Sequence, residues 1–278
     1  MDTGSAAVPD VASLTTGARI APARHDLSVV GALTQRGLQR MRRIPSLIIP
    51  AIVMPMFFVI AFSGSFNSLS KLPDFPTSKT INWMVPYAIL QGASFAGVGA
   101  AGGTATDIEG GFFDRLLLAP SRRWALLVGP LGYSALRSLI PTTLVLVVSL
   151  LIGADLPGGA LGALVLFVAS VGVALTFGTM SLAFVYKMRS LRALAVVQIF
   201  IFVMMFLSIG QVPLKFQSGW LHAVARINPM TNVLRLARQG FLPGGVTWHD
   251  TWPGLVALAA MIGGFGALAW RGLRRYIR

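Results

Sequence analysis

The chain has 278 residues, of which 55% are hydrophobic and only 12% are charged, and its formal net charge at pH 7 is +14. This composition argues against a soluble globular domain, because such domains carry about 25% charged residues. The basic residues are spread between apolar runs rather than gathered into a patch with interleaved aromatic residues, so membrane topology explains the charge better than nucleic-acid binding.

The N-terminal part divides into two segments. Residues 1–26 are polar and contain no apolar core, which predicts a disordered cytoplasmic tail. Residues 27–45 alternate apolar positions with arginines such as Arg36 and Arg40. A basic amphipathic helix directly before an apolar segment is typical of an interfacial helix on the cytoplasmic side of a membrane. A plain basic flank to the first span is the alternative.

Six apolar segments follow, each near the roughly 20 residues that a helix needs to cross a bilayer. They lie at about 46–64, 83–106, 125–152, 160–186, 193–213 and 252–270. We therefore predict an all-α polytopic membrane protein, with a six-span domain over residues 46–271 and a basic cytoplasmic tail over 272–278. Most of the lysines and arginines lie in the connections on one side, which places both termini in the cytoplasm. The excess of arginine over lysine and the abundance of alanine and glycine are consistent with a GC-rich bacterial genome, and hence with the bacterial plasma membrane.

The connection between the second and third apolar segments, residues 107–123, contains acidic, basic and aromatic residues. Its helical periodicity clusters Phe112 and Phe113 on one side, with Asp114 and Arg115 beside them. This pattern predicts a short amphipathic surface helix that Pro120 ends. Its mixed charges suit docking to another protein better than binding to anionic lipid. An ordinary solvated loop that happens to be amphipathic is the alternative.

Arg137 is a charged residue inside the third apolar segment. Because this segment is longer than the hydrocarbon core requires, Arg137 is expected to lie in the inner leaflet, where it snorkels toward water or faces a partner helix. A role in a translocation path is the functional alternative.

The connection before the last apolar segment, residues 213–250, is too apolar for a solvated loop. We predict two short helices broken at Asn228-Pro229 and folded back into the outer leaflet as a re-entrant hairpin. Asn228 is expected to cap the second helix, which leaves Arg235 and Arg238 one turn apart on one face. These arginines then either form an outer gate or anchor the helix to lipid phosphates.

The sequence offers little for catalysis. It lacks a P-loop motif, a Gly-x-Ser-x-Gly elbow and any cysteine, and its three histidines are scattered, so neither an enzyme site nor a metal site is expected. An ATPase-independent carrier or channel remains an alternative. The absence of paired carboxylates in the spans and of an evident internal repeat weighs against it.

Two motifs resemble a known family. The segment from Asp107 to Pro120 is similar to the E-R-E-x-G-T-x-E-x-L-x-x-x-P segment of the membrane subunit of type-2 ABC exporters, particularly the daunorubicin-resistance-like permeases of actinobacteria. Ile108 and Phe112 depart from that pattern, where the family often has a basic residue and a small hydroxyl residue. The Asn228 to Thr231 stretch, followed by Arg238, is similar to the family's Asn-Pro-[Leu/Met/Val]-Thr stretch before the last span. The resemblance covers about residues 28–278.

The resemblance implies the permease subunit of an ATP-driven exporter that moves an amphipathic drug, lipid or lipid-linked compound. Two permease chains, identical or homologous, would pack with P-loop ATPase subunits that use ATP and Mg, while this chain binds no cofactor. Residues 27–45 would form the family's connecting helix and residues 107–123 its coupling helix. The residues implied in ATPase docking are Asp107, Glu109, Phe112, Phe113, Asp114 and Arg115.

Overall fold

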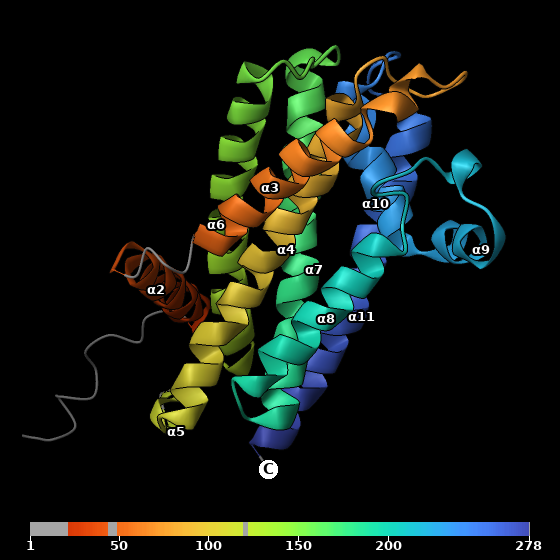
Figure 1. Cartoon of the computed structure of the whole chain (residues 1–278). Coiled ribbons are helices and arrows are strands. Elements are labelled where there is room, and N and C mark those ends of the chain that lie inside the picture. Colours follow the sequence, from red (N-terminus) through yellow and green to blue (C-terminus); the bar gives the residue numbers. More distant parts are fainter. Residues whose placement is uncertain (1–21, 44–48, 119–121, 278) are drawn as a thin grey trace, which may run out of the picture.

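The computed structural model describes residues 22–43, 49–118 and 122–277, and all regular elements in these ranges are helices (Figure 1). The expected tail over 1–26 lies mostly outside these ranges, as do the start of the first apolar segment and the Pro120 break. Residues 22–26 belong instead to α2 (Pro22–Arg43), which begins earlier than predicted. The first part of α2 is joined to the start of α6, because the buried Asp26 accepts a hydrogen bond from the backbone N–H of Arg122 at 3.0 Å.

Four long apolar helices form the bundle, and each is long and apolar enough to cross a membrane. They are α4 (Thr80–Glu109), α6 (Arg123–Leu151), α7 (Gly159–Met188) and α11 (Trp248–Tyr276). The other two predicted spans form shorter apolar helices, α3 (Ile49–Ser65) and α8 (Arg192–Phe206). At 1.5 Å per residue these reach about 26 and 22 Å, less than the roughly 30 Å of a hydrocarbon core. The all-helical class is confirmed, and six spans remain a prediction.

Helix α4 lies at the centre of the bundle and packs against α3, α6, α7 and α8. Its small residues allow this, because neighbouring backbones approach closely where side chains are absent. A Cβ at Gly97 would clash with the carbonyl oxygen of Ala174 on α7, and one at Gly92 would lie 2.9 Å from the carbonyl oxygen of Ala51 on α3. The glycine-rich face of the second apolar segment is therefore a packing surface.

The two ends of the bundle carry different elements (Figure 1). One end carries α5 (Phe112–Leu118) and the end of α11, while α2 lies outside the bundle against α6. The other half of the bundle carries the short helices η2 (Asn67–Lys71), η3 (Leu214–Phe216), α9 (Gly219–Ile227), α10 (Pro229–Arg238) and η4 (Gln239–Phe241), and α9 lies at its side.

The predicted break at Asn228-Pro229 is confirmed, because α9 ends and α10 begins there. The two helices differ in environment. Helix α10 packs against α11, α7 and α4, whereas α9 projects from the bundle and buries only Ala225 (Figure 1). The re-entrant placement of this pair remains a prediction.

Candidate functional site

Helix α5 is positioned by a sharp turn at the end of α4. Gly111 has φ 68°, a left-handed conformation that glycine adopts at low cost, and the chain then starts a new helix at Phe112. Phe113 is only 2% exposed. Its ring packs edge-on against that of Tyr276, with 5.3 Å between the ring centroids, and its centroid lies 5.8 Å from that of the Tyr186 ring. Phe113 thus packs α5 against the ends of α7 and α11.

The outer surface of α5 combines charge with apolar area. Arg115 is exposed, and Leu118 is 87% exposed. Phe112 is partly exposed, and the Arg36 guanidinium lies 4.5 Å from its ring centroid. The Asp114 carboxylate accepts a hydrogen bond from the Tyr276 hydroxyl at 3.0 Å. A short helix with charged and apolar side chains is therefore present within the predicted segment 107–123, but it begins only at Phe112, because residues 107–109 form the end of α4.

Two acidic residues before α5 hold other parts of the chain. The Asp107 carboxylate accepts two hydrogen bonds from the Arg36 guanidinium, at 2.6 and 2.7 Å, which joins α4 to α2. Glu109, beyond the apolar part of α4, accepts hydrogen bonds from the Leu191 N–H and the Ser190 hydroxyl, both at 2.8 Å. These bonds favour the carboxylate and lower the pKa of Glu109 below its usual value.

The six residues that the resemblance implied in docking thus separate into two groups. Phe113 is buried in the chain's own core, so we correct its expected role as an apolar anchor for a partner. Asp107 and Glu109 are engaged inside the chain, and Asp114 bonds Tyr276. Phe112 and Arg115 remain available at the surface, together with Leu118, which the sequence analysis did not single out.

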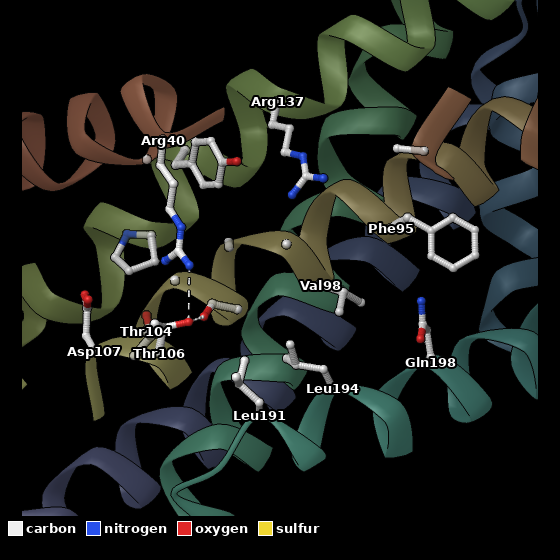
Figure 2. A pocket seen from close by; sticks show the side chains of 18 of the residues that line it. Arg40, Phe95, Val98, Thr104, Thr106, Asp107, Arg137, Leu191, Leu194 and Gln198 are labelled. Carbon is white, nitrogen blue, oxygen red and sulfur yellow. Dashed lines mark hydrogen bonds between the residues drawn. The ribbon is translucent and has the colours of Figure 1, made fainter. Parts of the chain in front are cut away.

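A cavity of about 630 Å³ opens beside α4, between α2, α3, α6 and α8 (Figure 2). Its walls are mostly apolar and include Met54, Phe95, Val98, Leu194 and Phe202. Its charged lining residues are Arg36, Arg40, Arg137 and Asp107, which leaves an excess of positive charge once Asp107 is paired with Arg36. Arg40 also donates a hydrogen bond to the Thr106 hydroxyl at 3.3 Å.

Arg137 points from α6 toward α4 in this cavity (Figure 2). Its guanidinium lies 5.9 Å from the Tyr133 ring centroid, and the residue is 5% exposed. The space it occupies exists because residue 99 is glycine, since a Cβ there would overlap the guanidinium. Arg137 therefore faces α4, while its snorkelling toward water stays a prediction. Its predicted role in translocation stays a prediction.

One end of the bundle thus exposes charged and apolar side chains of α5, and an amphiphilic cavity lies beside α4. The family model for ABC-2 type transporters matches residues 28–242, more than half of the chain. The chain belongs to the ABC-2 type transporter family. In this family the chain is a membrane subunit without catalytic activity, and ATP hydrolysis occurs in a separate ATPase subunit.

The relatives of this ABC-2 chain include a drug-resistance permease and transport permeases. The daunorubicin resistance ABC transporter permease protein DrrB1 of Streptomyces coeruleorubidus is 26% identical over 240 residues, which cover 85% of this chain and 82% of that protein. The transport permease ycf38 of Porphyra purpurea is 26% identical over 225 residues, covering 80% and 76%. With its apolar helices, the ABC-2 chain is a multi-pass membrane protein.

At the opposite end of the ABC-2 chain, Asn228 joins α8 to α10. Its side-chain oxygen accepts the Met230 N–H at 2.9 Å, so the predicted cap is confirmed. Its amide nitrogen donates to the carbonyl oxygens of Met204 and Leu207, at 2.7 and 2.9 Å. Pro229 takes the first helical position, where a missing N–H costs nothing.

Arg235 and Arg238 do not share an environment, contrary to the prediction that they lie together on one face. Arg235 is exposed, whereas Arg238 is 1% exposed. The Arg238 guanidinium stacks on the Trp83 ring, with its central carbon 3.6 Å from the ring centroid. The Arg238 guanidinium donates hydrogen bonds to the carbonyl oxygens of Trp83 at 3.1 Å, Ile209 at 2.7 Å and Gly210. A buried side chain does not reach lipid phosphates, so the anchoring alternative applies to Arg235 alone.

Sequence reasoning missed two contacts of this site, Arg36–Asp107 and Tyr276–Asp114. Their partners lie 71 and 162 residues apart in the chain, so no local pattern signals them. In the ranges that the structure describes, no group of three or more His, Asp or Glu side chains could hold a metal ion.

Proposed function

We propose that this ABC-2 chain is the permease subunit of an ATP-driven exporter in a bacterial plasma membrane, with α5 as the helix on which a P-loop ATPase acts. The observation that carries the proposal is the two-sided character of α5. Its inner side is seated by Phe113, while Arg115 and Leu118 face outward at the end of the bundle. ATP and Mg would be bound by the partner, and this chain would bind no cofactor.

The contacts around α5 would transmit a displacement of this helix to the rest of the bundle. Helix α5 follows α4 after one turn, and α4 is tied to α2 through Asp107 and to the start of α8 through Glu109. Tyr276 connects α5 with α11. Because packed interiors transmit strain, a displacement of α5 would move these helices as a unit between two states.

The proposed assembly has six spans per chain and two permease chains, identical or homologous. Helices α3 and α8 would complete the six spans, since both are apolar and both expose large side chains that lipid or the second chain would cover. These side chains include Ile49, Val53, Phe57, Ile60, Ile199 and Val203. The α9–α10 pair would lie at the outer face as the re-entrant element, with both termini in the cytoplasm.

The cavity beside α4 supports an amphipathic cargo. Its apolar walls suit an aliphatic or aromatic body, and the arginine excess suits an anionic group. A drug, a lipid or a lipid-linked compound fits this description. The drug-resistance relative makes a drug one natural choice among them.

The orientation can be tested with single cysteines, because the chain contains none. We expect Arg274→Cys, exposed at the α5 end, to be shielded from an impermeant thiol reagent in intact cells and to react after permeabilisation. His249→Cys, at the opposite end with a highly exposed side chain, should react in intact cells. Labelling of Arg274→Cys from outside would place α5 away from any cytoplasmic ATPase and refute the proposed function.

The role of Arg137 can be tested with dansylaminoundecanoic acid, an anionic fluorescent amphiphile, and its uncharged methyl ester. Loss of one charge-assisted interaction in a low-dielectric site is expected to weaken binding about tenfold. Arg137→Gln should therefore weaken binding of the acid by that factor and leave binding of the ester unchanged, as measured by fluorescence titration of the purified chain.

Gly99→Ala provides a matched variant that keeps the charge and displaces it. A methyl group at residue 99 overlaps the present guanidinium position, so the acid is expected to bind more weakly here too. Equal loss of acid and ester binding in both variants would indicate a damaged cavity wall. Unchanged acid binding in both would remove Arg137 from cargo recognition.

A further inference from the structure

A second cavity lies at the α5 end of the bundle, between the ends of α7 and α11. Its volume is about 450 Å³, and its lining includes four basic residues and no acidic one. The basic residues are Lys187, Arg189, Arg271 and Arg275. None of the four forms an ion pair with another residue of the described ranges. Four like charges around one hollow create a strong attraction for an anion.

The lining changes from apolar to basic along both helices. On α11, Leu268 precedes Arg271 and Arg275 on one helical face, and Leu268 is 51% exposed. On α7, Phe184 precedes Lys187 in the same way. The apolar part therefore lies toward the middle of the bundle and the basic part toward its end. A phospholipid at a membrane surface has the same polarity, with its acyl chain inside and its phosphate at the interface.

We propose that this cavity binds the phosphate headgroup of an anionic membrane lipid, with an acyl chain against Leu268 and Phe184. Basic pockets between membrane helices on the cytoplasmic side are suited to such headgroups. Arginine adds directional, charge-assisted hydrogen bonds to phosphate oxygens. A free phosphate ester would use the basic part and leave the adjoining apolar surface uncovered.

The cavity has a direct contact with α5. Tyr276 lines the cavity, and the Arg189 guanidinium lies 4.4 Å from its ring centroid. The same tyrosine donates its hydroxyl hydrogen to Asp114 and packs against Phe113. A lipid that holds Arg189 and Tyr276 therefore also steadies α5. Lipid binding itself does not depend on the proposed export function, whereas its effect on coupling rests on that function.

The test uses the full chain, purified in detergent and titrated with phosphatidylglycerol while thermal unfolding is followed. Each arginine near an anionic phosphate is expected to contribute about fivefold to affinity. Arg271→Gln should weaken the effect of phosphatidylglycerol by about that factor. Arg274→Gln is the matched control, because Arg274 is exposed on the same helix, carries the same charge and does not line the cavity. It should respond like the wild type.

Three outcomes would overturn the proposal. Equal weakening by Arg271→Gln and Arg274→Gln would mean that overall charge alone attracts the lipid. Equal stabilisation by phosphatidylcholine would remove the need for an anionic headgroup. An equal effect of glycerol phosphate would assign the site to a free phosphate ester.

The contact with α5 has its own readout. Phosphatidylglycerol should slow hydrogen exchange of residues 112–118 in the wild type, because α5 is steadied through Tyr276. Asp114→Ala removes the acceptor of the Tyr276 hydroxyl and does not alter the lining of the cavity, so this variant should bind the lipid normally and show a smaller slowing. Unchanged exchange in the wild type, despite normal lipid binding, would separate the site from α5 while leaving the proposed export function untouched.

Discussion

Replacement of Arg238 by methionine is expected to destabilise the chain by about 4 kcal/mol. Methionine fills a similar space but cannot donate hydrogen bonds, so the carbonyl groups of Trp83, Ile209 and Gly210 lose their donor in a buried site. Each such loss costs about 1–3 kcal/mol. The thermal unfolding midpoint in detergent, followed by the fraction of monodisperse protein after heating, should fall by roughly 10 °C.

Two other variants make this prediction specific. Arg235→Met lies one turn away and is exposed, so its midpoint should stay within about 2 °C of the wild type. Arg238→Lys should give an intermediate result, because an ammonium group donates hydrogen bonds but lacks the planar fork and the stacking on Trp83. Equal stability of Arg238→Met and the wild type would show that Arg238 does not hold this end of the bundle.

Arg238 also shows why the sequence predicted one part of this region and not another. Asn228-Pro229 is a local signal, because asparagine caps a helix through its own side chain and proline suits the first helical position. The break and the cap were therefore predictable. The acceptors of Arg238 are carbonyl groups 28, 29 and 155 residues away, and no local pattern records them. From periodicity alone, an arginine on an amphipathic helix is assigned to the surface.

The fifth apolar segment illustrates a similar limit of hydropathy. Residues 207–213 extend the apolar run, but α8 ends at Phe206. Gly210 then passes close to the Tyr87 ring, at a position where a Cβ would clash with it. Gly210 and Pro213 are turn-forming residues that signal the helix end, and a hydropathy window records composition without them.

At the α5 end the sequence predicted the element but not the direction of every side chain. The alternation of apolar and charged residues in 107–118 is sufficient to predict a short amphipathic helix. Whether a phenylalanine faces the bundle or a partner depends on Tyr186 and Tyr276, which are distant in the chain. The same holds for Asp107, whose carboxylate is matched by Arg36 on α2.

Reversal of the exposed charge on α5 is expected to uncouple this chain from its ATPase. The double variant Arg115→Glu, Leu118→Ser changes two of the outward side chains and leaves Phe113, Asp114 and their contacts intact. Like-charge contact at a docking surface costs several kcal/mol, and each 1.4 kcal/mol is a factor of ten in affinity. Recovery of the ATPase with the affinity-purified chain in mild detergent should fall at least tenfold, with a matching loss of ATP hydrolysis in proteoliposomes.

Arg274→Glu is the matched control for this experiment, because it reverses an exposed charge at the same end of the bundle outside α5. Its ATPase recovery should stay within about twofold of the wild type, since a single distant surface charge is screened by salt. Thermal unfolding of both variants should resemble that of the wild type, because neither change reaches the core. An equal loss in Arg274→Glu would attribute the effect to the overall charge of this end. Full ATPase recovery with the α5 variant would place the docking surface elsewhere. The charged residues of α5 are Asp114 and Arg115, and Asp114 already accepts a hydrogen bond from Tyr276, so Arg115 is the charge that a partner would contact.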